Sequence, residues 1–327
     1  MLLPVTAGHL AFLRQVALPM AAFPPGVRRP EEPLALDEVA RYLDGWGRQG
    51  DLGLVAVVDG RPVGAAWIRT FAPDRPGYGF VGADVPELTV AVVAAHRGQG
   101  LGGALVLGVL DLAAVHAYRQ VSLSVAEAVN PGAAKLYRSV GFADVASDAG
   151  GSTTMVAATA PRRPTARAHR CDELARARSA SAFDGPALVR LREVMFDAAG
   201  NGGHPTWVST MLRRWSSDGP DGPLLAAVVD GRDGRPVASA MAEVSTGLPA
   251  PGLDDGRFAW FSSVATDPAW RGLGAAGAAG SALLERIDEL GIDQSRLAAT
   301  VSSQVIYQRL GFRRSAGPLM MRDRPTR

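Results

Sequence analysis

The sequence predicts two tandem copies of one α/β (α+β) fold. Two observations support this prediction. Three motifs occur twice in the same order, and helical and strand patterns follow one another in the same succession in each half. The length of 327 residues is long for a single compact core and sufficient for two domains.

The repeat consists of three pairs of motifs. VVDGRPV (57–63) recurs as VVDGRDGRPV (228–237), RGQGLG (97–102) as RGLGAA (271–276), and YRSVGF (137–142) as YQRLGF (307–312). The separations are 171, 174 and 170 residues, counted from 58 to 229, from 97 to 271 and from 137 to 307. Unrelated motifs in one order at nearly constant spacing indicate a duplication.

Each copy begins with helical patterns and continues with strands. An apolar helical period covers Gly8–Met20 and Pro186–Ala198, and a second helical stretch ends near Trp46 or Trp215. Two β-rich runs follow, joined by an Asp-Gly turn, which is a strong hairpin signal because both of its central residues need positive φ. A loop rich in proline and glycine then covers residues 71–80 or 247–256.

The second part of each copy contains the glycine-rich motif. In the first copy the helix after it places Leu101, Leu105, Val109 and Leu112 on one face. The remaining predicted strands are Leu88–Val93, Gln120–Ala126 and Ser152–Ala157 in the first copy, and Phe258–Thr266, Arg296–Val301 and Pro318–Arg322 in the second.

The predicted division of the chain is residues 1–158, a connector over 159–182, and residues 183–327. The connector is rich in Arg, Ala, Pro and Ser. Residues 166–180 show no alternation of apolar and polar residues that would indicate the first strand of the second copy.

Composition narrows the function. The formal net charge is +2, which does not predict nucleic-acid binding, and no apolar run is long enough to span a membrane. The only cysteine, Cys171, excludes an intrachain disulfide and is expected to be inert. The histidines show no metal-ligand spacing. Pro4, His9 and Arg14 interrupt any signal-peptide pattern, so a cytoplasmic location is expected.

The glycine-rich motif predicts an anion site. Arg97-x-x-Gly100-x-Gly102 follows a strand and opens a helix, where backbone N–H groups lack acceptors and the helix dipole favours negative charge. The spacing differs from a dinucleotide-binding loop, and the lysine of a nucleotide-triphosphate loop is absent. A tight turn without a ligand is the alternative.

Taken together, the strand, the glycine-rich loop and the segment Asn130-Pro131 to Tyr137 and Gly141-Phe142 resemble the GNAT superfamily of acyl-CoA-dependent N-acyltransferases. The resemblance covers nearly all of residues 1–158 and, in the second copy, about 183–325. It implies two tandem GNAT folds, each a mixed, mostly antiparallel sheet flanked by helices. It also implies acetyl-CoA as the cofactor.

The resemblance implies a role for the strand before each loop. That strand parts from its neighbour and presents backbone N–H groups to the thioester carbonyl. Each loop holds the pyrophosphate of CoA. The residues implied are Val90, Ala91, Val92, Arg97, Gly98, Gln99, Gly100, Leu101, Gly102 and Gly103 in the first copy, and Val264, Ala265, Thr266, Arg271, Gly272, Leu273, Gly274, Ala275 and Ala276 in the second. Asn130 either orients the cofactor or caps the following helix.

The candidate catalytic residues are a tyrosine in each copy and one glutamate. Tyr137, with Tyr307 as its counterpart, is expected to donate a proton to the departing thiolate, since a phenol stays protonated at neutral pH. Satisfied core tyrosines are the alternative. Glu87 is the candidate base, with a solvated strand-end carboxylate as the alternative. His96 is expected beside the CoA, and Trp46, Phe71, Tyr78 and Phe80 are candidates for the acceptor pocket or for ordinary packing.

The second copy departs from the first. Its strand, RFAWFSS (257–263), has no glutamate at the position of Glu87, and Val301-Ser302-Ser303-Gln304 replaces the Asn-Pro start. We therefore expect an N-acetyltransferase that moves acetyl from acetyl-CoA to a primary amine of a small molecule, by direct attack in a ternary complex within a monomer or homodimer. The alternatives are a non-catalytic CoA-binding sensor or scaffold, and an enzyme whose active copy is the C-terminal one, in an arrangement similar to that of mycothiol synthases.

Overall fold

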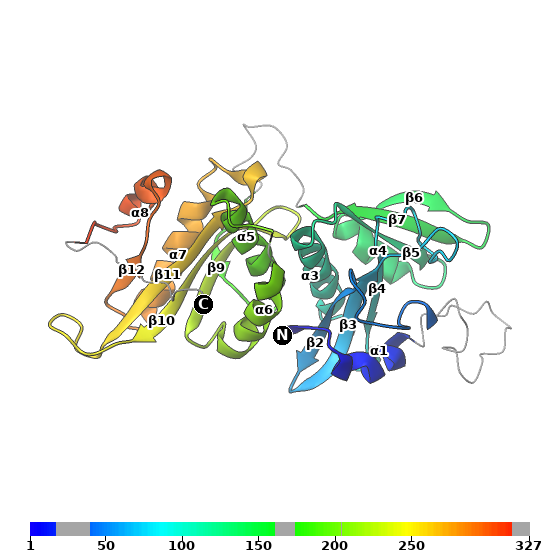
Figure 1. The fold of residues 1–327 in the computed structure, drawn as a ribbon, viewed down its shortest axis with the longest axis horizontal. Coiled ribbons are helices and arrows are strands. Elements are labelled where there is room, and N and C mark those ends of the chain that lie inside the picture. Colours follow the sequence, from blue (N-terminus) through cyan, green and yellow to red (C-terminus); the bar gives the residue numbers. More distant parts are fainter. Residues whose placement is uncertain (18–39, 161–173, 204, 316–327) are drawn as a thin grey trace, which may run out of the picture.

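The computed structural model describes residues 1–17, 40–160, 174–203 and 205–315. It contains two α/β halves that lie side by side, each with a central sheet flanked by helices (Figure 1). The predicted fold class, a tandem pair of mixed and mostly antiparallel sheets, is confirmed. Three predicted features, the end of the first helix at Met20, Cys171 and the strand Pro318–Arg322, lie outside the described residues.

The first half contains a seven-stranded sheet in the order β1-β2-β3-β4-β5-β7-β6. Every neighbouring pair of strands is antiparallel except β4 and β5, which are parallel. Its elements are β1 (Leu2–Pro4), η1 (Ala7–His9), α1 (Leu10–Ala17), β2 (Leu52–Val58), β3 (Arg61–Arg69), β4 (Glu87–Val92), η4 (Ala94–His96), α3 (Leu101–Val115), β5 (Gln120–Ala126), α4 (Pro131–Ser139), β6 (Ala143–Ser147) and β7 (Ser152–Ala158).

Local sequence explains the central part of this half. Asp59 (φ 48°) and Gly60 (φ 73°) both have positive φ, as the Asp-Gly turn between β2 and β3 requires. The four leucine and valine positions predicted on one face of α3 are all buried against the sheet. Burial of that stripe fixes α3 across β2, β3 and β4, and this places the loop before α3 at the end of β4.

The second half contains a five-stranded sheet in the order β12-β11-β10-β9-β8, with β11 and β12 parallel. The strand predicted at Arg296–Val301 is shorter than expected: it covers Ser295–Leu297, and a 3-10 helix begins at Val301. The elements are β8 (Arg178–Ser179), α5 (Gly185–Ala198), η7 (Pro205–Trp207), α6 (Val208–Asp218), β9 (Leu224–Asp230), β10 (Pro236–Thr246), β11 (Arg257–Thr266), η8 (Pro268–Trp270), α7 (Ala275–Glu289), β12 (Ser295–Leu297), η9 (Val301–Ser303) and α8 (Gln304–Arg309).

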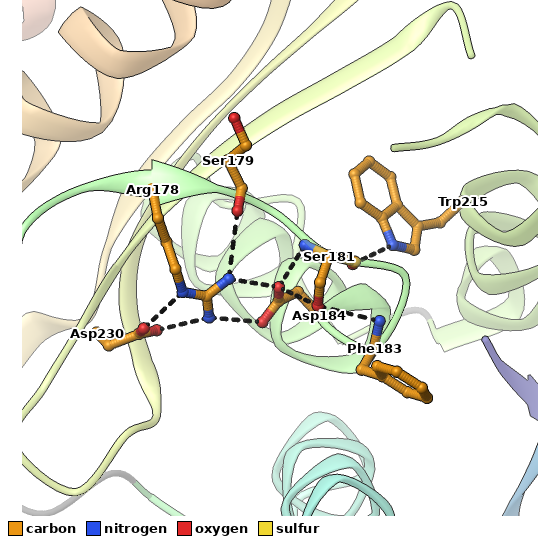
Figure 2. A network of polar contacts seen from close by, with 7 residues as sticks. All are labelled: Arg178, Ser179, Ser181, Phe183, Asp184, Trp215 and Asp230. Carbon is orange, nitrogen blue, oxygen red and sulfur yellow. Dashed lines mark hydrogen bonds and ion pairs between the residues drawn. The ribbon is translucent and has the colours of Figure 1, made fainter. Parts of the chain in front are cut away.

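Arg178 ties the beginning of the second half to its sheet (Figure 2). Its guanidinium group binds Asp230 at the end of β9 at 2.7 and 3.0 Å, and Asp184 before α5 at 2.8 and 3.0 Å. Asp184 also accepts hydrogen bonds from the backbone and hydroxyl of Ser181. Arg178–Ser179 therefore belongs to the second sheet, although it lies inside the segment predicted as a connector. A strand of two residues is too short to show the alternation of apolar and polar residues that predicts a strand.

The two halves share a buried interface between α3 and α5. Asp111 of α3 accepts hydrogen bonds from Arg190 Nε of α5 and from Arg235 before β10, both at 2.7 Å. Arg190 also donates to Asp267 at 3.2 Å, and all four side chains are buried. Three apolar side chains of the second half, Val189, Val208 and Leu212, belong to the hydrophobic core of the first.

Candidate active site

The parallel strands β4 and β5 part soon after they meet. They pair only at Glu87 and Ser122, where the Ser122 N–H donates to the Pro86 carbonyl at 3.0 Å. Backbone groups of successive strand residues point to opposite edges. Pro86 faces β5, whereas the N–H of Val93 donates to Val63 on the side of β3.

This alternation decides which N–H groups of β4 face the gap. Val90 and Val92 point toward the gap between β4 and β5, and Ala91 points toward β3, where it pairs with Ala65. The resemblance implied that Val90, Ala91 and Val92 all present N–H groups to the thioester. The strand direction leaves only the N–H groups of Val90 and Val92 facing the gap. In β11 the same reasoning selects Val264 and Thr266, because the N–H of Asp267 donates to Val237 of β10.

The glycine-rich loop lies at the end of β4. Gly98 (φ 75°) and Gly100 (φ 79°) adopt left-handed conformations, and no atom lies within 4 Å of a Cβ built on either residue. The first N–H that closes the helical ladder of α3 is that of Ala104, which bonds to Gly100. The N–H groups of the three residues before it therefore have no acceptor in the helix, and such groups at a helix N-terminus are suited to bind an anion.

An arginine fixes each loop to the strand before it. Arg97 Nε donates to the carbonyl of Val92 at 3.0 Å, and Arg271 Nε donates to Thr266 at 3.3 Å. Gly272 (φ 81°) and Gly274 (φ 85°) repeat the left-handed positions of the first loop. The two loops thus have the same backbone design, which the recurring motif predicted.

Tyr137 lies on α4, close to the first loop. Its neighbour Leu136 is in contact with the start of α3, where a Cβ on Gly102 would be 3.3 Å from a Leu136 methyl group. Burial raises the pKa of Tyr137 to about 12, so the phenol is protonated at neutral pH but is a weaker acid than a free phenol. No hydrogen bond joins its hydroxyl to another residue in the part of the chain that the structure describes.

Asn130 caps the helix that carries this tyrosine. Its side-chain oxygen accepts a hydrogen bond from the N–H of Ala133 at 3.1 Å, and Pro131 occupies the first turn. Of the two roles considered for Asn130, capping is therefore the one for which the structure gives a contact.

Glu87 is buried, with 3% of its surface exposed, so the interpretation as a solvated strand-end carboxylate is wrong. Burial raises the pKa of Glu87 to about 7, and the hydrogen bond from Tyr42, the nearby N–H of Gly79 and the charge of Arg41 oppose this rise. A carboxyl with a pKa near neutrality is suited to accept and release protons.

Sequence reasoning missed Tyr42. Its hydroxyl donates to Glu87 Oε1 at 2.7 Å and accepts the N–H of Tyr78 at 2.7 Å. The rings of Phe71 and Tyr78 pack on the ring of Tyr42 with centroid distances of 4.9 and 6.2 Å. No local sequence pattern predicts a contact between residues that are 45 positions apart.

The other aromatic candidates differ in position. Trp46 packs against a separate core cluster and under the guanidinium group of Arg69, which places it in ordinary packing. Phe80 is half-buried, and His96 ends the 3-10 turn before the loop. Of the predicted set, Phe71 and Tyr78 pack directly on the ring of Tyr42, which binds Glu87.

The second half has a different strand at the corresponding place. Trp260 pairs with Glu243 of β10, as Glu87 pairs with Arg69 of β3, so an indole replaces the carboxyl. β11 also contains a bulge near Ser262, which is absent from the regular register of β4. Burial raises the pKa of Tyr307, and a pocket of about 290 Å³ lies beside it.

The described helices include none that is long and apolar enough to cross a membrane. Within residues 1–17, 40–160, 174–203 and 205–315, no group of three or more His, Cys, Asp or Glu side chains is arranged to hold a metal ion.

Comparison with models of protein families gives two matches to the acetyltransferase (GNAT) family, over residues 17–142 and 188–312. These segments make up more than half of the chain, and the chain belongs to that family. Each match falls on one of the two halves, in agreement with the tandem arrangement.

Solved structures similar to this chain include three bacterial proteins. A predicted acetyltransferase with acetyl-CoA from Clostridium acetobutylicum is 19% identical, with 46% of this chain and 96% of that chain covered and a TM-score of 0.42. A GCN5-related N-acetyltransferase from Ralstonia eutropha is 23% identical (47% and 98% covered, TM-score 0.38). A ribosomal-protein-alanine N-acetyltransferase from Brucella melitensis is 21% identical (48% and 99% covered, TM-score 0.38). No curated protein matches the chain.

Proposed function

We propose that the protein is an N-acetyltransferase that moves the acetyl group of acetyl-CoA to a primary amine of a small molecule, and that the first half contains the working site. The observation that carries this proposal is Glu87. It is a buried carboxyl with a pKa of about 7, at the point where β4 and β5 part. Attack on a thioester requires an unprotonated amine, and this group can take the proton near neutral pH.

Residues of the first half supply the other requirements. Acetyl-CoA, when bound, supplies the activated acetyl group. The N–H groups at the start of α3 and the cradle at Gly98 and Gly100 hold the pyrophosphate. The N–H of Val90 donates to the carbonyl oxygen as negative charge develops there.

Proton transfers complete the proposed reaction. Glu87 accepts the proton of the amine as the new N–C bond forms. Tyr137 donates its proton to the sulfur as the C–S bond breaks, and a pKa of about 12 keeps that proton in place until the sulfur becomes basic. Direct attack needs no covalent enzyme intermediate.

The first test is release of free thiol from acetyl-CoA across a panel of primary amines. We expect release that depends on one class of amine, a strong reduction in Tyr137→Phe, and a comparable reduction in Glu87→Gln. Binding of CoA by the wild type without thiol release for any amine would instead favour the non-catalytic sensor or scaffold.

The second test separates the two halves with Gly100→Glu and Gly274→Glu, which place a carboxylate in one loop at a time. Both residues have left-handed φ, so the two substitutions strain the backbone equally and serve as matched controls. Loss of turnover in Gly100→Glu alone is expected from the proposal. Loss in Gly274→Glu alone would assign the work to the second half.

The second half remains a distinct candidate because of one observation. The pocket beside Tyr307 is lined by residues of β12 and α8, including Gln304 and Tyr307, by Ala299, and by residues 312–315 after α8. An enzyme that uses this half has Trp260 at the position of Glu87, so its rate would not depend on the ionisation of Glu87.

A further inference from the structure

Glu87 has two carboxyl oxygens in unlike surroundings. Oε1 accepts the hydrogen bond from the Tyr42 hydroxyl at 2.7 Å. Oε2 is buried and has no hydrogen-bond partner in the part of the chain that the structure describes. A buried oxygen without a hydrogen-bond partner lowers the stability of the fold, so its presence calls for an explanation. The difference between the two oxygens indicates that Oε2 is the one available for proton transfer.

The position of Tyr42 is fixed from several directions. Trp67 Nε1 donates to the Tyr42 carbonyl at 3.2 Å. Arg69, which is buried and anchored by Asp51, donates to the carbonyls of Arg41 and Asp44 on either side, both at 2.7 Å. Since Arg69 pairs with Glu87 in the sheet register, one pair of neighbouring strands holds both the carboxyl and its tyrosine.

We propose that Tyr42 is a positioning residue for the proposed base: its hydroxyl holds Oε1 of Glu87 and leaves Oε2 as the oxygen that accepts the proton of the acceptor amine. The catalytic meaning of this inference rests on the proposed function, whereas the Tyr42–Glu87 pair itself does not. In the step, an N–H bond of the amine breaks, an O–H bond forms on Oε2, and Tyr42 keeps its own proton. Burial and the charge of Glu87 raise the pKa of Tyr42, which keeps that proton on the phenol.

The surroundings of Oε2 support this division of roles. A Cβ on Gly77 would lie 2.1 Å from Oε2 and 2.8 Å from the Tyr42 hydroxyl, so the glycine leaves space beside this oxygen that any side chain would fill. Two more buried hydroxyls, of Thr89 and Ser122, also lack partners among the described residues. Both share the sheet face of Glu87, so a water or an amine over that face of β4 and β5 would have three oxygens without partners near it.

The groups that face Glu87 determine how its pKa responds to a change. They are the Tyr42 hydroxyl, Arg41, the backbone of Gly79, the paired Arg69 and the hydroxyl of Ser122. Among these, the backbone N–H of Gly79 and the Tyr42 hydroxyl both lower the pKa of Glu87, and the Tyr42 hydroxyl is the one that a substitution can delete with little change of volume. A hydrogen bond to a charged group corresponds to about one to two pKa units, so Tyr42→Phe should raise the pKa of Glu87 by that amount.

The experiment is a carbon-13 NMR titration of the full chain with labelled glutamate carboxyls. In wild type we expect one resonance that titrates near pH 7 and is missing in Glu87→Gln. Its midpoint should move upward in Tyr42→Phe and stay in place in Tyr118→Phe. Tyr118 is the matched control, because it is a half-buried tyrosine whose hydroxyl lies beside Gly50 instead of Glu87.

A second variant covers the case in which Tyr42→Phe does not fold. Replacement of Tyr42 by 3-fluorotyrosine keeps the ring and makes the phenol a stronger donor, so the midpoint should move downward. An unchanged midpoint in either folded variant would overturn the proposal. Because this titration needs no turnover, an inactive wild type would refute the proposed function and leave the pair to be judged separately.

The pH dependence of kcat/KM distinguishes a positioning role of Tyr42 from a merely structural one. The reduced kcat/KM of Tyr42→Phe should recover as pH rises above the new midpoint, since Glu87 ionises there. A reduction that is the same at every pH would show that the tyrosine only supports the fold.

Discussion

Replacing Asp111 with alanine would leave two buried guanidinium groups without the carboxylate they share. Asp111 accepts hydrogen bonds at 2.7 Å from both Arg190 and Arg235 at the interface of the two halves. Breaking a buried ion pair by removal of one partner costs about 3–5 kcal/mol. Arg190 keeps the carboxylate of Asp267 and Arg235 keeps the carbonyl of Thr159, so we expect the lower end of that range.

The assay is urea unfolding followed by circular dichroism, with the midpoint and slope compared between variants. The control is Asp144→Ala, which removes a carboxylate from the exposed Arg138–Glu127–Asp144 network and should leave the midpoint almost unchanged. The combined variant Asp111→Leu, Arg190→Met, Arg235→Leu and Asp267→Asn should be more stable than Asp111→Ala, because it leaves none of these four buried positions with an unpaired charge. An Asp111→Ala midpoint equal to that of wild type would refute the reasoning.

Three further predictions follow from the site and the second half. Burial raises the pKa of Glu87 from 4.5 to about 7. The protonated carboxyl therefore favours the folded state at pH 4, and this contribution to the free energy of unfolding is lost as the pH rises to about 7. In denaturant unfolding, Glu87→Gln should reduce the difference in unfolding free energy between pH 4 and pH 8 by roughly 3 kcal/mol. An equal pH slope in both proteins would contradict it. Gly100→Ala should lower the free energy of unfolding by about 1–2 kcal/mol, because alanine is strained at the φ of 79° that Gly100 adopts. Thermal unfolding should show a larger loss for this variant than for Gly102→Ala, because the φ of Gly102 is not in the left-handed range. Arg178→Met should leave Asp184 and Asp230 without their shared cation and make the second half more susceptible to proteolysis, whereas Arg257→Met, with a single 3.9 Å pair, should not.

The features that sequence predicted are those fixed by local chemistry. Positive φ at Asp59 and Gly60, the left-handed glycines of both loops and the buried stripe of α3 each follow from a few neighbouring residues. The left-handed glycines of the loop recur in the second half and made the fold class predictable, whereas Asp230 and Gly231 do not have positive φ and the turn there has its left-handed residue at Gly234 (φ 75°). Capping by Asn130 is local in the same sense, since its partner is three residues away.

The features that sequence did not predict depend on distant contacts or on strand geometry. Tyr42 meets Glu87 only because Arg69 and Trp67 hold its segment against the sheet. The burial of Glu87 depends on how closely the backbone at Gly77 approaches it, which a loop sequence does not reveal. Likewise, the direction of the Ala91 N–H follows from the register with β3, and a single-residue shift would reverse it.

The interface at α3 and α5 has a consequence for the integrity of the chain. Val189, Val208 and Leu212 complete the core of the first half, and the Asp111 carboxylate neutralises charges of the second. A break of the peptide chain between residues 160 and 174 would therefore not release two free proteins. The fragments should remain together as a noncovalent heterodimer, and each expressed alone should expose apolar side chains and aggregate. The pair would then serve as a split protein that reassembles when both fragments are produced in one cell.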